Sequence, residues 1–92
     1  MARYAPLPST MHQLLNDPID VLVEFKNKRI APRRLHWDNR EYTIKQVNLI
    51  HGAREGAKRI FYFSVSDTAN FMKLRLDTET LEWRLVEVYT DG

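Results

Sequence analysis

The chain of 92 residues contains no cysteine. The lack of thiols excludes disulfide bonds, thiolate metal sites and catalysis by cysteine, and it is typical of proteins that work in a reducing cytosol. The first residues lack the apolar segment of a signal peptide, and no apolar run approaches the ~20 residues of a membrane-spanning helix. We therefore expect a cytoplasmic protein with no membrane partner.

The remaining composition is that of one small globular domain. Hydrophobic residues make up 43% of the chain, which is enough for one modest core and too much for a disordered chain. A chain of this length has no room for a separate cofactor-binding domain, so we expect no cofactor.

Apolar and polar residues alternate along most of the chain, which is the period-two pattern of half-buried β-strands. The alternation is clear in residues 19–26, 60–66, 72–76 and 81–85, and short polar turns separate these segments. The sequence therefore predicts an all-β fold of about six antiparallel strands that form a small barrel or a strongly curved meander sheet. The inward-facing apolar residues form the predicted core: Val21, Val23, Phe25, Trp37, Tyr42, Ile44, Phe61, Phe63, Val65, Leu74, Leu76, Trp83 and Leu85.

The first 17 residues have a different pattern. The prolines near the start favour an extended arm, whereas a cap at Ser9 or Thr10 favours a short helix with an apolar stripe of Met11, Leu14 and Leu15. We keep both alternatives for residues 1–17 and predict a single small β domain over residues 18–92.

The clearest predicted hairpin joins residues 33–37 to residues 40–50 through Asp38-Asn39, two residue types that tolerate the positive φ of a type I′ turn. A change of apolar parity predicts a bulge near Lys45-Gln46 that bends the second strand. Pro32 is expected to keep residues 30–32 out of a central strand, and residues 51–59 are predicted to be a loop.

Several segments of the chain together resemble a known family: Pro-Ile-Asp-Val at 18–21, Pro32, Trp-Asp-Asn-Arg-Glu-Tyr at 37–42, Phe-Tyr-Phe at 61–63, Trp-Arg-Leu at 83–85 and Val-Tyr at 88–89. The family consists of short bacterial proteins of unknown function. A similar segment ends some catalytically inactive, polymerase-like subunits of bacterial mutagenesis complexes (the ImuB type). The resemblance covers most of the chain, provides no functional residues, and implies a link by association to DNA-damage tolerance.

The charge of the chain is unevenly distributed. Residues 26–60 contain ten lysines and arginines and three acids, for a net charge of +7, whereas the segments before and after sum to −2 and −3. A basic block of this kind attracts polyanions, because phosphate attraction adds up over many weak contacts. The loop residues of this block are the candidate nucleic-acid-binding residues: Lys26, Lys28, Arg29, Arg33, Arg34, Arg54, Lys58 and Arg59.

Other residue patterns do not predict a chemical site. Residues 51–59 contain two glycines but lack the Gly-Lys-Ser/Thr of a phosphate loop and a following helix. The three histidines are far apart in the sequence and do not have the spacing of metal ligands. The acids of residues 77–82 lie in a predicted turn, where carboxylates are usually solvated and are not tuned for acid–base catalysis. We therefore expect no metal site and no enzyme activity.

Two functions are compatible with these observations. The leading hypothesis is a binding module for DNA or RNA linked to DNA repair, in which basic loops contact phosphates and Tyr62, Phe71 and Tyr89 stack on bases. The alternative is a protein-protein interaction module that uses a sheet edge or the N-terminal arm, for example with a polymerase-like partner.

Overall fold

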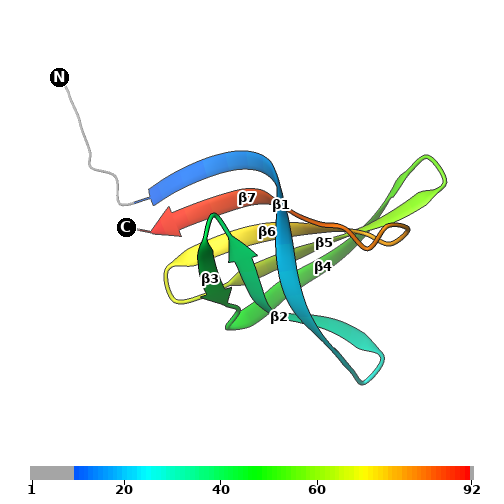
Figure 1. Cartoon of the computed structure of the whole chain (residues 1–92), viewed down its shortest axis with the longest axis horizontal. Coiled ribbons are helices and arrows are strands. Elements are labelled where there is room, and N and C mark those ends of the chain that lie inside the picture. The colour runs from blue at the N-terminus through cyan, green and yellow to red at the C-terminus, as the bar shows by residue number, and fades with distance from the viewer. Residues whose placement is uncertain (1–9, 92) are drawn as a thin grey trace.

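The structure, a computed structural model, describes the backbone of residues 10–91 and the side chains of residues 12–90. The described residues form one antiparallel sheet of seven strands and contain no helix (Figure 1). Of the arm predicted for residues 1–17, residues 1–9 lie outside the described residues. The strands are β1 (Thr10–Lys26), β2 (Arg29–Trp37), β3 (Arg40–Thr43), β4 (Gln46–Glu55), β5 (Lys58–Ser66), β6 (Asn70–Asp77) and β7 (Trp83–Asp91).

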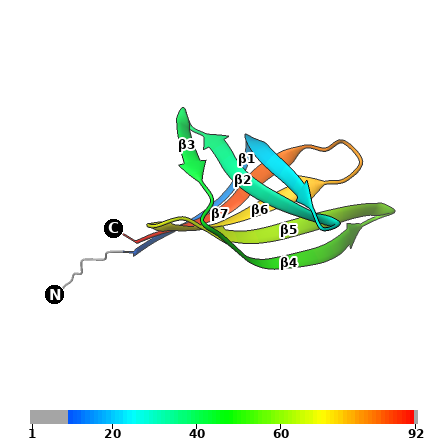
Figure 2. The same ribbon diagram turned by 90° about the horizontal axis from the view of Figure 1, so that it is seen from below.

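The long strand β1 connects the two parts of the sheet, whose order is β3-β2-β1-β7-β6-β5-β4. Its first half pairs with β7 and its second half pairs with β2, and the register shifts between Leu14 and Asp17 and again between Leu22 and Val23. Bulges of this kind increase strand twist and bending. As a result, the β1–β2–β3 part crosses over one face of the β4–β7 part, as Figure 2 shows.

The two ends of the sheet, β3 and β4, are consecutive in the chain but are not paired with each other in the described residues. The link between them, Ile44-Lys45, donates one backbone hydrogen bond to Arg33 O of β2 and one to Ser66 O of β5, both of 2.8 Å. The prediction of an all-β antiparallel fold is confirmed. The sheet is strongly curved and does not close into a barrel.

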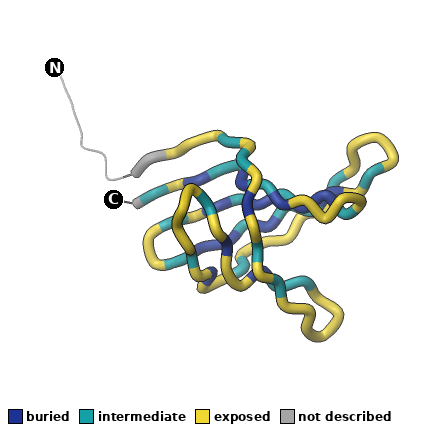
Figure 3. The backbone as a smooth tube through the Cα atoms, viewed as in Figure 1, coloured by how far each residue is buried: buried dark blue, intermediate teal, exposed yellow. Residues whose placement is uncertain are grey.

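The core lies between the two crossing parts, where buried segments from both meet (Figure 3). Leu35 of β2 faces residues of the larger part such as Phe63, Leu74 and Leu85, and each of them is at most 1% exposed. Most predicted core residues are buried or half-buried, but Phe25 is 77% exposed, so its prediction is wrong. Phe25 lies near the end of the β1–β2 hairpin, which extends beyond the region where the two parts of the sheet cover each other. Among the buried residues of the hydrophobic core, the predicted set omits Ile19, Leu35, Ile60, Met72 and Val88.

Two-residue turns connect several strands. Asp38 and Asn39 have φ values of 51° and 64°, which confirms the predicted type I′ turn. Asn27 and Lys28 adopt the same left-handed conformation, at 53° and 62°, where the sequence indicated only a break in the pattern. The β4–β5 hairpin turns at Gly56, whose φ is 65°, a left-handed conformation that glycine adopts without steric cost.

Of four local expectations, three differ from the structure. The short helix is absent, because residues 10–17 pair as a strand with β7 and a helix of that length is marginal by itself. Pro32 belongs to β2, but β3 pairs only with residues 34–37, so residues 30–32 have β1 as their single neighbour and lie at an edge, as expected. The parity change near residue 45 marks a break between β3 and β4, and the register shift lies slightly later, between Val47 and Leu49 of β4. Residues 51–59 form most of a hairpin and not a loop.

Truncation of Phe63 tests the core. We expect Phe63→Ala to lower the free energy of unfolding by about 3–5 kcal/mol, because the ring is fully buried and leaves a cavity. Phe25→Ala is the matched control and should change it by less than about 0.5 kcal/mol. If chemical denaturation shows the same loss of unfolding free energy for Phe63→Ala and Phe25→Ala, the described core is contradicted.

Leu81 provides a test of the β6–β7 turn. Its φ is 64°, a conformation in which an L side chain crowds the backbone, and the side chain is exposed, so little packing compensates. Leu81→Gly should therefore raise the free energy of unfolding by about 0.5–1 kcal/mol. Leu81→Ala keeps the Cβ atom and should give no gain, and a destabilised glycine variant would contradict the left-handed assignment.

Candidate nucleic-acid interface

The basic block divides between two hairpins. The β1–β2 hairpin contains Lys26, Lys28 and Arg29 at its end, and the β4–β5 hairpin contains Arg54, Lys58 and Arg59 at its end. Both hairpin ends extend past the rest of the sheet on the same side of the molecule and are largely exposed (Figures 1 and 3).

A cleft lies between the two hairpins on the inner face of the sheet. Lys28, Arg29 and Ile30 line it from the β1–β2 hairpin, and Ile50, Phe61 and Phe63 line it from β4 and β5. We call it the hairpin cleft. Phe63 forms its buried end, whereas Ile50 is 45% exposed. Phe25 is paired directly opposite Ile30, so its exposed ring lies on the same face of its hairpin.

The cleft continues toward the end of the β4–β5 hairpin. Gly52 lies opposite Phe61, and a Cβ atom on Gly52 would be 3.5 Å from the Phe61 ring, so the glycine leaves this side of the ring uncovered. The guanidinium of Arg59 lies 5.9 Å from the centre of the same ring. Arg54 is the cross-strand partner of Arg59, and both line the hollow next to Gly52. The cleft thus has an apolar floor that includes Ile50 and Phe61, and beside it a basic end formed by Arg54 and Arg59.

Arg54 and Arg59 form a like-charge pair on neighbouring strands, which costs stability. A second such pair, Arg75 and Arg84, lies between β6 and β7, but there Arg75 is bound to Glu55 and Arg84 to Glu82 at 3.0 Å. Among the described residues, no acid lies within 4.0 Å of Arg54 or Arg59.

The other candidate residues are separated from this cleft or neutralised. Arg33 is bound to Glu24, and its hydrogen bond and charge hold the pKa of the Glu24 carboxyl below its usual value. Arg34 lies 3.6 Å from Glu41 and beside Leu22, on the face of β2 that is turned away from Leu35 and the core. The structure therefore brings together only part of the predicted set.

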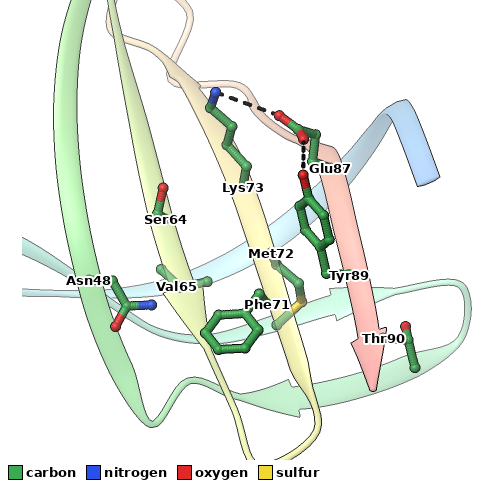
Figure 4. Close-up of a pocket in the computed structure, with 9 residues that line it drawn as sticks. All are labelled: Asn48, Ser64, Val65, Phe71, Met72, Lys73, Glu87, Tyr89 and Thr90. Atoms are coloured by element: carbon green, nitrogen blue, oxygen red, sulfur yellow. Dashed lines mark hydrogen bonds and ion pairs between the residues drawn. The ribbon is translucent and has the colours of Figure 1, made fainter. Parts of the chain in front are cut away.

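The three predicted stacking residues lie on the opposite face of the sheet. Tyr62 alternates with Phe61 and Phe63 along β5, and Phe71 and Tyr89 face each other across β6 and β7. Figure 4 shows Phe71 and Tyr89, which line a pocket together with Asn48 and Ser64.

Charges on this opposite face are mutually neutralised. Lys73 lies 3.6 Å from Glu87, and His12 contacts the same carboxylate at 3.0 Å, which holds the pKa of Glu87 below its usual value. The His12 ring also stacks on Tyr89, with ring centres 4.0 Å apart. This face thus has aromatic rings without free cations, whereas the hairpin cleft has both. The aromatic residues that line the cleft, Phe61 and Phe63, and the nearby Phe25 all belong to the core that the sequence pattern predicts.

The described part of the chain contains no cluster of three or more His, Cys, Asp or Glu side chains that could hold a metal ion. Over the same residues no helix is long and apolar enough to cross a membrane.

Comparison of the chain with protein-family models, with curated proteins and with solved structures finds no match.

Lys58, the last candidate residue, has a structural contact. Its ammonium donates a 2.9 Å hydrogen bond to Oδ2 of the buried Asp77. Oδ1 of the same carboxylate accepts backbone hydrogen bonds from Glu79 and Thr80, at 2.9 and 3.2 Å, and so shapes the β6–β7 turn. The Lys58 hydrogen bond lowers the pKa of Asp77, and the carboxylate raises the pKa of Lys58.

This contact predicts a pH dependence. Because the Asp77 pKa is lower in the folded chain than in the unfolded one, its stabilisation is present above the unfolded pKa of about 4 and is lost as the pH falls through the folded pKa. Asp77→Asn should destabilise the domain at pH 7, and the difference should shrink below about pH 4. When the chain also carries Lys58→Met, the loss of stability caused by Asp77→Asn should depend less on pH. Urea unfolding of the four proteins measures this, and a difference that does not change with pH would contradict it.

Proposed function

We propose that this domain binds single-stranded nucleic acid in the hairpin cleft, with phosphates at the basic ends and bases on the apolar floor. The observation that carries the proposal is the Arg54–Arg59 pair, two like charges held side by side with no acid within 4.0 Å among the described residues. A bound phosphate relieves their repulsion and accepts hydrogen bonds from both guanidinium groups.

The floor of the cleft supports a single strand as the ligand. Ile50 and Phe61 lie between the basic ends, and Phe25 exposes most of its ring on the facing hairpin. Bases of a single strand are free to stack on such side chains, and stacking tolerates any sequence. Lys28 and Arg29 provide phosphate contacts at the other end of the cleft. No group in the cleft is placed to read one base, so the proposed binding is sequence-tolerant, with a dissociation constant of about 1 μM or weaker.

The proposed role is binding without catalysis. The resemblance of the chain to the family that includes the carboxyl-terminal segment of inactive, polymerase-like subunits favours DNA-damage tolerance as the setting. In that setting, single-stranded DNA is the first ligand to test, and RNA is the second.

A matched pair of double variants tests the site. Arg29→Gln with Arg59→Gln removes two charges from the cleft, whereas Arg33→Gln with Arg34→Gln removes two charges from the β2 region outside it. In fluorescence anisotropy with a labelled oligonucleotide of about ten nucleotides, the first variant should lose more than about tenfold in affinity at low salt. The slope of log affinity against log salt should fall in magnitude by about 1.4, or 0.7 per lost phosphate contact.

The control variant should lose clearly less and keep the slope of the wild type. Equal losses in the two variants would place the site outside the cleft. No binding of DNA or RNA by the wild type at low salt, where attraction between charges is strongest, would overturn the proposal.

Phe25→Ala separates stacking from charge. The ring is exposed, so its removal should leave the melting temperature unchanged while weakening oligonucleotide binding by about 1–3 kcal/mol if a base stacks on it. Binding to inorganic polyphosphate, which has no bases, should be unaffected. A loss of affinity for both ligands, or for neither, would contradict the stacking role.

A further inference from the structure

Strand β4 is the long open edge of the sheet. It pairs with β5 on one side and has no strand neighbour on the other among the described residues. Figure 2 shows β4 at the border of the sheet, where the β1–β2–β3 part does not cover it. Alternate N–H and C=O groups of such a strand point outward without a ladder partner, and an exposed edge of this kind pairs readily with another strand.

The other open edges have protecting features that β4 lacks. Strand β3 is only four residues long. The first half of β1 is interrupted by Pro18 and by the register shift between Leu14 and Asp17. In β4 the register shift lies near the start, between Val47 and Leu49, and the rest of the strand is regular. Short strands, prolines and bulges are the usual protection of edges, so β4 is the edge that can accept a partner.

We propose that β4 pairs with β4 of a second copy of this chain, antiparallel and around a two-fold axis at His51. A segment that pairs with its own copy around a two-fold axis must be self-complementary. With the axis at His51, Leu49 lies opposite Ala53 of the second copy and Ile50 lies opposite Gly52. Large residues thus meet small ones on both faces of the joined sheet, the arrangement that packs most closely.

Exposure and charge agree with this register. Leu49 and Ile50 are 61% and 45% exposed on opposite faces of the strand, and a paired strand covers both. The stretch from residue 46 to residue 53 has no lysine, arginine, aspartate or glutamate. In the register centred on His51, Arg54 lies opposite Asn48 and Glu55 opposite Val47, so no like charges face each other across the joined strands.

Cysteine substitution tests this register directly, because the natural chain contains no cysteine. His51→Cys places two thiols opposite each other at the axis, at the Cα separation of about 4.5–5.5 Å that a disulfide spans. Val47→Cys places them about 27 Å apart. Under mild oxidation, His51→Cys should form a disulfide-linked dimer at least about tenfold faster than Val47→Cys or a Leu22→Cys control on the β1–β2 part. Equal rates at all three positions would overturn the proposal.

Oligomeric state provides the second measurement. Sedimentation of the wild type should show a concentration-dependent dimer, and Leu49→Lys should raise its dissociation constant at least about tenfold, because charged side chains block edge pairing. Leu22→Lys is the matched control, exposed to a similar degree at 56%, and should leave the dimer intact. A monomeric wild type, or a dimer that both lysine variants weaken equally, would overturn the proposal. Leu49 lies on the face opposite the hairpin cleft, so the nucleic-acid affinity of Leu49→Lys reports the cleft independently.

Discussion

The divided pairing of β1 is the constraint on which the rest of the structure depends. A strand of 17 residues cannot stay flat across a twisted sheet, and the two register shifts let its halves follow two directions. The first half extends the sheet beside β7, and the second half carries β2 and β3 across the inner face. This crossing buries Leu35 against Phe63 and its neighbours, and it places the β1–β2 hairpin opposite β4 and β5. The core and the hairpin cleft therefore have the same origin.

Charge pairing distinguishes the two faces of the molecule more clearly than charge content does. Both faces contain arginines on adjacent strands, but Arg75 and Arg84 are bound to acids, and Arg54 and Arg59 are not in contact with any described acid. Aromatic rings also occur on both faces. In the hairpin cleft, cations that contact no described acid adjoin exposed apolar groups, which is the combination that binding of single-stranded nucleic acid uses. The same β4–β5 hairpin also provides the open edge, and Ile50 belongs to both features: it lines the hairpin cleft and lies in the part of β4 that is proposed to pair with a second copy.

Local sequence signals were reliable where the local interaction is strong. Asp38-Asn39 predicted its turn because few residue types tolerate two consecutive positive φ values. The alternation around Phe63 predicted a strand with the correct buried face. The signals failed where a distant partner decides the conformation. Residues 10–17 have a weak helical stripe, but pairing with β7 satisfies more backbone hydrogen bonds than a helix of that length can. Phe25 continues the buried face of its strand by parity, yet lies beyond the point where the covering part ends.

The sequence by itself determined the all-β class, the position of the clearest hairpin and the basic excess in the middle of the chain, since each follows from side-chain chemistry at neighbouring positions. Only the tertiary structure decided which basic residues lie together. Lys28 and Arg29 line one cleft with Phe61 because β1 bends, whereas Arg33 is neutralised by Glu24 and does not line that cleft. Ion pairs and clefts between distant strands depend on register and curvature, and small bulges set both.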